Sequence, residues 1–141
     1  MQPHPSIHGD GCIWETTTYH GCVSAEIFLP VFEMQTTTDE ASVSLSLRDQ
    51  LVASRLTPCV KIQAGCQSTY YWGGGWQSAD EYVITALTLE AHLAQLVAII
   101  KSAHNYVNPE IVARKIVVLS KEYASWLDSA LAELQAVSHE P

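Results

Sequence analysis

The chain has 141 residues, of which 48 % are hydrophobic and only 16 % are charged, so it can bury the core of a single globular domain. Its net charge is −8, and its seven basic residues begin only at Arg48, which argues against nucleic acid and anionic membranes as partners. No apolar run reaches the roughly twenty residues of a membrane span, and the N-terminus lacks the pattern of a signal peptide, so we expect a cytoplasmic protein.

Residues 1–22 show hardly any hydrophobic periodicity, which predicts a weakly ordered N-terminal arm followed by one domain over residues 23–141. The arm is either a polar tail or a weak site for a soft metal ion, since imidazole and thiol groups are metal ligands. Its candidate ligands are His4, His8, Cys12, His20 and Cys22. The four cysteines of the chain follow no zinc-finger or disulfide spacing, so we expect reduced thiols.

Val23 to Gln35 carries a first strand, with Pro30 at its start or at an edge position that needs no donor. Thr37 and Glu40 then fit a capping box at the start of a helix. Apolar residues follow at nearly helical spacing, and Pro58 is expected to end the element. The apolar stripe consists of Val43, Leu47, Leu51 and Leu56.

Two runs rich in β-branched and aromatic residues, Cys59 to Trp72 and Trp76 to Thr88, flank Gly73-Gly74-Gly75 and predict a β-hairpin. Its arms are about twice the usual strand length, so the tip should project beyond a small sheet. The projecting part is aromatic and would need a cover, provided by another copy of the chain or by a local loop. The aromatic residues are Tyr70, Tyr71, Trp72 and Trp76, and we interpret them, together with Trp126 near the C-terminus, as an oligomer interface.

Thr88 is predicted to cap a second helix with Glu90 in its first turn, ending near His104-Asn105. Ile111 to Leu119 is predicted to form a fourth strand, and Ser120 to cap a final helix. The buried side of the second helix should contain Leu89, Leu93, Leu96, Val97 and Ile100, and that of the final helix Trp126, Leu127, Ala130, Leu131 and Leu134.

This order of elements predicts an α+β fold, a ferredoxin-like split βαβ sandwich with an extra C-terminal helix. Both of the first two helices would cover one face of an antiparallel sheet. In the third strand, alternating residues are apolar in both directions, which indicates that the helices cover one face and a symmetric neighbouring subunit the other. Tyr82, Ile84 and Ala86 point one way, and Val83, Thr85 and Leu87 the other.

The stretches YYWGGGW with a following Glu81, KSAHNYVNPEI and YASWL, together with LTPCV before the hairpin, resemble the CutA family of divalent-cation tolerance proteins. The similarity runs from about Thr36 to Leu134. It implies a ferredoxin-like subunit, a homotrimer in which hairpins pair with neighbouring sheets, and a cytoplasmic, non-enzymatic role associated with copper and other divalent metals. It also implies a trimer architecture similar to that of the PII signalling proteins.

The chain departs from the family pattern at three positions. Thr36 and Ala103 stand where some members have a cysteine and a histidine, and Leu87 stands where a lysine is common. Two candidate copper ligands are therefore missing, and the N-terminal arm has no counterpart in the family pattern.

His104 and Glu110 are the pair best suited to a divalent metal, because imidazole and carboxylate ligands are close in the sequence AHNYVNPE. Cys59, Cys66 or a residue of the N-terminal arm could complete the site, which would bind copper or another divalent cation weakly and would not be required for folding. Alternatively, His104 and Glu110 bond only to nearby backbone groups, and Cys59 acts as a small hydrophobe.

No catalytic motif occurs in the chain, so we predict no enzymatic activity. The leading hypothesis is a trimeric divalent-metal tolerance or response protein whose partners are copies of itself and metal ions. The alternative is a PII-like module that binds a small anionic ligand at the subunit clefts, and a purely structural trimer is a third possibility. The basic residues that could gather at such a cleft are Lys101, Arg114, Lys115 and Lys121.

Overall fold

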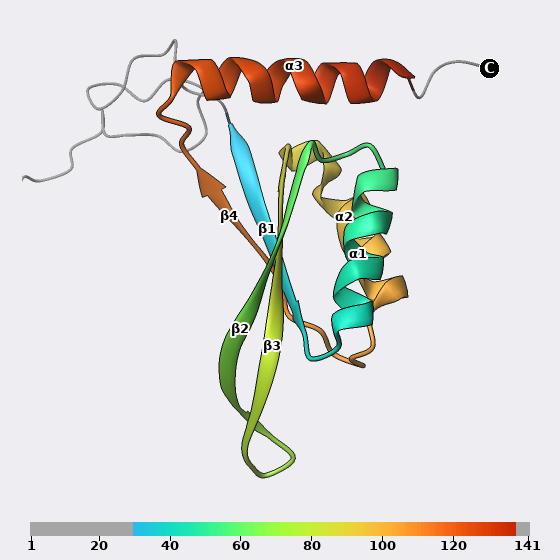
Figure 1. Ribbon diagram of the computed structural model, residues 1–141, viewed down its shortest axis with the longest axis vertical. Helices are drawn as coiled ribbons and strands as arrows, with labels where there is room; N and C mark the ends of the chain where they lie inside the picture. The colour runs from blue at the N-terminus through green and yellow to red at the C-terminus, as the bar shows by residue number, and fades with distance from the viewer. Residues whose placement is uncertain (1–29, 138–141) are drawn as a thin grey trace, which may run out of the picture.

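A computed structural model of the chain describes residues 30–137 (Figure 1). The predicted N-terminal arm and its candidate ligands therefore lie outside the described residues, as do the first seven residues of the expected strand from Val23. The elements in chain order are β1 (Val31–Thr38), α1 (Ala41–Ala53), β2 (Cys59–Trp72), β3 (Gly75–Thr88), a short 3-10 helix (Glu90–His92), α2 (Leu93–Ala103), β4 (Ile111–Ile116) and α3 (Lys121–Val137).

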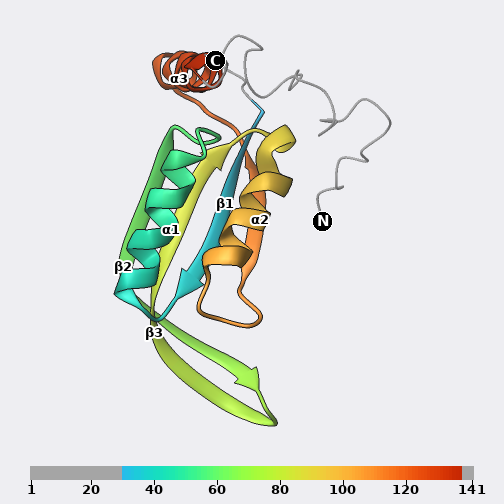
Figure 2. The same cartoon turned by 90° about the vertical axis from the view of Figure 1, so that its right-hand side faces the viewer.

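The four strands form one sheet in the order β2-β3-β1-β4, and every neighbouring pair is antiparallel. Helices α1 and α2 lie side by side on one face of this sheet (Figure 2). This order and layering are those of the split βαβ arrangement, which confirms the predicted α+β fold and the extra C-terminal helix.

Two hydrophobic clusters hold the layers together. The larger one lies between the sheet and α1 and α2, where Ile84 and Ala86 of β3 meet Leu47, Leu96 and Ile100. The second cluster joins Val31 and Leu87 to Leu127 and Leu131 of α3, which crosses the end of the sheet away from the hairpin tip (Figure 1). Both faces of β3 are therefore covered, but not as expected, because α3 of the same chain covers Leu87, where a neighbouring subunit was predicted to do so.

The long hairpin is confirmed, and its two strands have 14 residues each. Gly73 and Gly74 form the tight turn with φ of 60° and 84°, a left-handed conformation that glycine adopts without strain. A register shift between Gln63 and Cys66, with Gly65 at φ 82°, bends the ribbon. The strands run on beyond the rest of the sheet, so the tip projects as predicted (Figure 2).

The predicted capping box at Thr37 and Glu40 is wrong. Thr37 and Thr38 continue β1 by pairing with Val83 and Tyr82, so β1 ends three residues later than expected. Glu40 is the N-cap residue of α1 but makes no side-chain cap bond. The Thr38 hydroxyl instead accepts the Glu40 backbone N–H at 3.2 Å.

Helix α1 ends at Ala53, four residues before the position where Pro58 was expected to end it. The cause is Arg55, which has the left-handed φ of 61° that closes a helix. Its conformation is held by α3, because the Arg55 guanidinium donates to the Leu134 carbonyl at 2.9 Å and the Arg55 carbonyl accepts from Gln135 at 2.8 Å.

Thr88 does not cap α2, because it is the last residue of β3 and its buried hydroxyl donates to the Leu56 carbonyl at 2.7 Å. Helix α2 ends at Ala103, close to the expected place, but with extended backbone at His104 rather than a left-handed Asn105. Strand β4 ends at Ile116, three residues early. Ser120 caps α3 as predicted, since its hydroxyl accepts the Tyr123 N–H at 3.2 Å.

Candidate functional site

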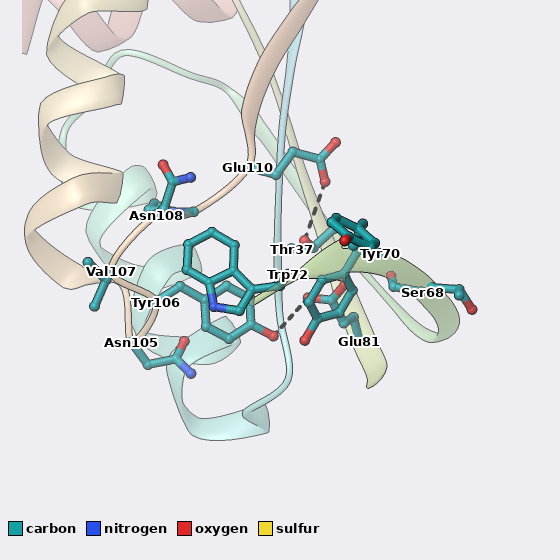
Figure 3. A pocket seen from close by; sticks show the side chains of 13 residues that line it. Thr37, Ser68, Tyr70, Trp72, Glu81, Asn105, Tyr106, Val107, Asn108 and Glu110 are labelled. Carbon is teal, nitrogen blue, oxygen red and sulfur yellow. Dashed lines mark hydrogen bonds between the residues drawn. The ribbon is translucent and has the colours of Figure 1, made fainter. Parts of the chain in front are cut away.

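A cavity in the described part of the chain lies between the outer part of the hairpin and the loop that joins α2 to β4 (Figure 3). It has a volume of about 780 Å³, within the usual range for small-molecule sites. The hairpin contributes aromatic rings, β1 contributes Thr37, and the loop contributes residues from Asn105 to Glu110. The aromatic lining consists of Tyr70, Tyr71, Trp72 and Tyr106.

The loop is fixed to the end of β1 by side-chain hydrogen bonds. The Thr38 hydroxyl donates to the Asn105 side-chain carbonyl at 2.7 Å, and the Asn105 amide donates to the Asp39 carboxylate at 2.9 Å. The Thr37 hydroxyl donates to the Glu110 carboxylate at 3.4 Å. One wall of the cavity is therefore held at several points along β1 and the turn that follows it.

Glu81 is the buried acid of the site. It lies on β3 just beyond the last pair with β1, and only 7 % of its surface is exposed. The Tyr106 hydroxyl donates to its carboxylate at 2.9 Å, as the dashed line in Figure 3 shows. Burial, then the hydrogen bond to Glu81 and the charges of Glu81 and Asp39, raise the pKa of Tyr106 above its ordinary value of 10.0. Tyr106 thus stays a neutral donor at physiological pH.

His104, a predicted metal ligand, is bonded to backbone through both ring nitrogens. Nδ1 accepts the Tyr106 backbone N–H at 3.0 Å, so the proton belongs to Nε2, which donates to the Thr37 carbonyl at 2.9 Å. His104 therefore bonds to backbone groups, as the alternative prediction stated. Its partners lie in β1 and the loop, whereas carbonyls of the helix were expected. A metal ion would have to displace one of these bonds.

The three predicted metal ligands do not come together. Glu110 lies at the rim of the cavity near Thr37, whereas Cys59 pairs with Leu87 at the far end of the sheet and packs against the α3 cluster. Within residues 30–137, no three His, Cys, Asp or Glu side chains are placed to hold a metal ion. This part of the chain therefore contains no preformed metal centre that fits the ion the resemblance implies. Cys59 and Cys66 are both free.

Neither position at which the family pattern has a copper ligand, Thr36 or Ala103, lines the cavity with Glu110. Thr36 is 1 % exposed and has the opposite strand parity to Thr37, so it faces the helix layer. Ala103 packs against the same core.

The predicted interface aromatics are exposed in the single subunit. Trp72 and Trp76 are 60 % and 72 % exposed, and Trp76 makes an edge contact with Tyr71 at 5.6 Å between ring centroids. Trp126 was expected on the buried side of α3 but is 48 % exposed, because Ala124, Leu127 and Leu131 form that side.

Sequence reasoning missed the pairing of Glu81 with Tyr106 and the role of Asn105 in holding the loop. A usable signal was present for Glu81. Glu81 lies on the same face of β3 as Val83 and Leu87, because side chains alternate along a strand. An acidic residue on this otherwise apolar face was the signal. Nothing in the sequence indicated that Tyr106, twenty-five residues later, would reach it.

Comparison with known proteins identifies the relatives of this fold and site. The sequence model described as CutA1 divalent ion tolerance protein matches residues 33–130. The divalent-cation tolerance protein CutA of Salmonella newport (strain SL254) is 30 % identical over 110 residues, which cover 77 % of this chain and 95 % of that protein.

Solved structures give the same result. CutA1 from Oryza sativa superposes with a TM-score of 0.68 at 27 % identity, covering 74 % of this chain and 95 % of that one. The protein from Archaeoglobus fulgidus, described as a periplasmic divalent cation tolerance protein CutA, has a TM-score of 0.66 and covers 72 % of this chain and 98 % of its own. At 24 % identity, the latter likeness shows the shared fold alone.

The Tyr106→Phe substitution should lower the free energy of unfolding by about 1–3 kcal/mol, because it removes the hydroxyl that donates to the largely buried Glu81 carboxylate. Urea denaturation followed by circular dichroism measures this loss. Tyr123→Phe is the matched control, since Tyr123 is exposed on α3. Equal stability of the Tyr106→Phe and wild-type chains would show that the bond does not stabilise the fold.

Proposed function

This chain belongs to the CutA1 divalent ion tolerance protein family, and on that premise we propose that it is a non-catalytic homotrimer that serves tolerance of, or response to, copper and other divalent cations. The observation that carries the proposal is the family match over residues 33–130, which spans all of the sheet except the first two residues of β1, and most of α3. The relative from Salmonella newport is named for divalent-cation tolerance.

Assembly is supported by the hairpin. Within residues 30–137, its outer strands pair only with each other, and they present Trp72 and Trp76 to solvent in one subunit. Large aromatic side chains are enriched in interfaces, and an uncovered apolar ribbon is prone to aggregation. Trp126 adds a further exposed ring on α3, within 5.5 Å of the Tyr123 ring. We propose that neighbouring subunits cover these aromatics.

Metal binding in this proposal is weak and involves few residues of the described chain. Glu110 is exposed at the cavity rim and is available to an ion. His104 would have to give up its bond to Thr37 or to Tyr106, and that exchange reduces the net affinity. The N-terminal residues His4, His8, Cys12, His20 and Cys22 offer further ligands in the sequence. Such sites suit transient binding rather than a structural metal.

The alternative of a PII-like anion sensor finds no support in the cavity. Its lining contains two carboxylates and no lysine or arginine, which opposes an anionic ligand there. An anion would have to bind in a cleft between subunits, so this hypothesis applies only to the assembled trimer.

We propose a cytoplasmic location, as expected from the sequence, although the Archaeoglobus fulgidus relative is described as periplasmic. No helix within residues 30–137 has the length and apolarity to cross a membrane.

Calorimetric titration of Cu²⁺ and of Zn²⁺ into the full chain should show saturable binding. The free energy of binding should be several kcal/mol less favourable than the roughly 10–16 kcal/mol of a structural zinc site. A chain beginning at Val23 separates the two candidate sites. Binding that survives truncation and weakens in Glu110→Gln belongs to the loop, and binding lost on truncation belongs to the arm. Absence of saturable binding in the full chain contradicts the metal proposal.

Light scattering at micromolar concentration should return three times the subunit mass of 15.5 kDa, because the exposed hairpin aromatics become buried only on assembly. A folded species with the mass of one subunit would contradict the trimer.

A further inference from the structure

We propose that Gly65 positions the outer ribbon, the part of the hairpin formed by residues 66–81, for contact with a second copy of the chain. The β-bulge at this glycine determines which aromatic side chains each face of the ribbon presents. This inference rests on the proposed homotrimer and deepens it by naming a residue on which its interface depends. Three observations support it, namely the register, the backbone conformation and the surroundings of Gly65.

The hairpin has one extra residue on β2 at the point where it leaves the sheet. Gln63 pairs with Val83, but the next pair is Cys66 with Glu81, so three steps along β2 correspond to two steps along β3. The pairing of β3 with β1 also ends within this shift, at Tyr82. The bulge therefore lies at the boundary between the four-stranded sheet and the outer ribbon.

The extra residue changes the face on which the β2 side chains of the ribbon lie. Paired residues share a face, and side chains alternate along a strand. The register places Tyr70 and Trp72 on the face of Glu81, and all three line the same cavity (Figure 3). Tyr71 and Trp76 are paired on the other face, where their rings are in edge contact. Without the bulge, Tyr71 would move to the face of Glu81 and lose this contact.

The turn at the tip requires the same shift in register. Trp72 pairs with Gly75, so the loop contains only Gly73 and Gly74, and both have the positive φ that a type I′ turn needs. If the register of the sheet continued without a bulge, the strands would be joined by an odd number of loop residues, and this two-residue turn could not form. The bulge and the turn together specify a single arrangement of the ribbon.

Gly65 is suited to the bulge by its backbone freedom. Its φ is 82°, in the left-handed region that a residue with a Cβ atom enters less readily by a factor of roughly five to thirty. In the described part of the chain, no heavy atom lies within 4 Å of the place where its Cβ would be. Alanine at this position would therefore be disfavoured by its backbone alone. Asparagine is larger but adopts left-handed conformations more often, so it should be tolerated better.

The cost of a poorly suited residue at this position should fall on assembly. Among residues 30–137, only β2 and β3 form the ribbon, and a two-stranded ribbon is marginally stable by itself. A dissociated subunit can therefore relax the strained residue, whereas a trimer would hold all three ribbons in one conformation. The effect on assembly is multiplied because the strained residue occurs once in every subunit.

Light scattering tests this role at a fixed protein concentration, in the urea concentration that leaves half of the wild-type subunits in trimers. Gly65→Ala should lower the fraction of subunits in trimers to about a tenth or less, because a cost of roughly fivefold recurs in three subunits. Gly65→Asn should retain more trimer than Gly65→Ala. Gly75→Ala is the matched control, because Gly75 lacks a positive φ and has no heavy atom of the described residues within 4 Å of its Cβ position, so it should assemble like the wild type.

Equal dissociation of Gly65→Ala and Gly75→Ala, or more complete dissociation of Gly65→Asn than of Gly65→Ala, overturns the role of Gly65 and leaves the trimer standing. A wild-type chain that has the mass of one subunit without urea contradicts the trimer itself, and this inference with it. If Gly65→Ala does not fold, Gly65→Asn still provides the test. Its trimer fraction must then stay above about a tenth, the level expected for a strained residue, and a lower fraction overturns the proposal.

Discussion

The rest of the structure depends on the mismatch between a long hairpin and a short sheet. Strand β1 ends its pairing with β3 at Tyr82, but β3 and β2 pair with each other as far as Gly75 and Trp72. In the described part of the chain, no third strand therefore pairs with the outer ribbon, and a two-stranded ribbon alone is marginally stable in water. Its aromatic side chains need contacts that the sheet cannot give. The loop after α2 supplies some of them, and a neighbouring subunit is proposed to supply the others.

The loop can play this part because it is anchored to the end of β1 and to β3. His104 bonds to the Thr37 carbonyl, Asn105 to Thr38 and Asp39, and Tyr106 to Glu81. These bonds fix a wall opposite the ribbon and leave a cavity between the two. The same bonds occupy His104, which is why the residue best suited to a metal in the sequence is committed to the backbone. His104 can bind a metal ion only by giving up a hydrogen bond that holds the loop in place.

The sequence predicted the elements, their order and the hairpin, because periodicity and the glycine turn are local signals. The predicted ends of elements were wrong where contacts with residues far along the chain determine them. Arg55 ends α1 through contacts with α3, and Thr88 is drawn to the Leu56 carbonyl rather than to a helix. The site was predicted only in part, since Glu110 and the hairpin rings do line a cavity whereas Cys59 lies at the far end of the sheet. The Glu81–Tyr106 contact depends on tertiary structure that no spacing encodes.

We propose that the outer ribbon, residues 66–81, is covered in solution. Hydrogen exchange of the full chain at micromolar concentration, resolved by amide, measures this cover. Paired amides of the ribbon should be protected to nearly the same degree as those of β1 in the interior of the sheet. Ribbon amides that exchange close to the rate of an unfolded chain, while β1 remains protected, would contradict it.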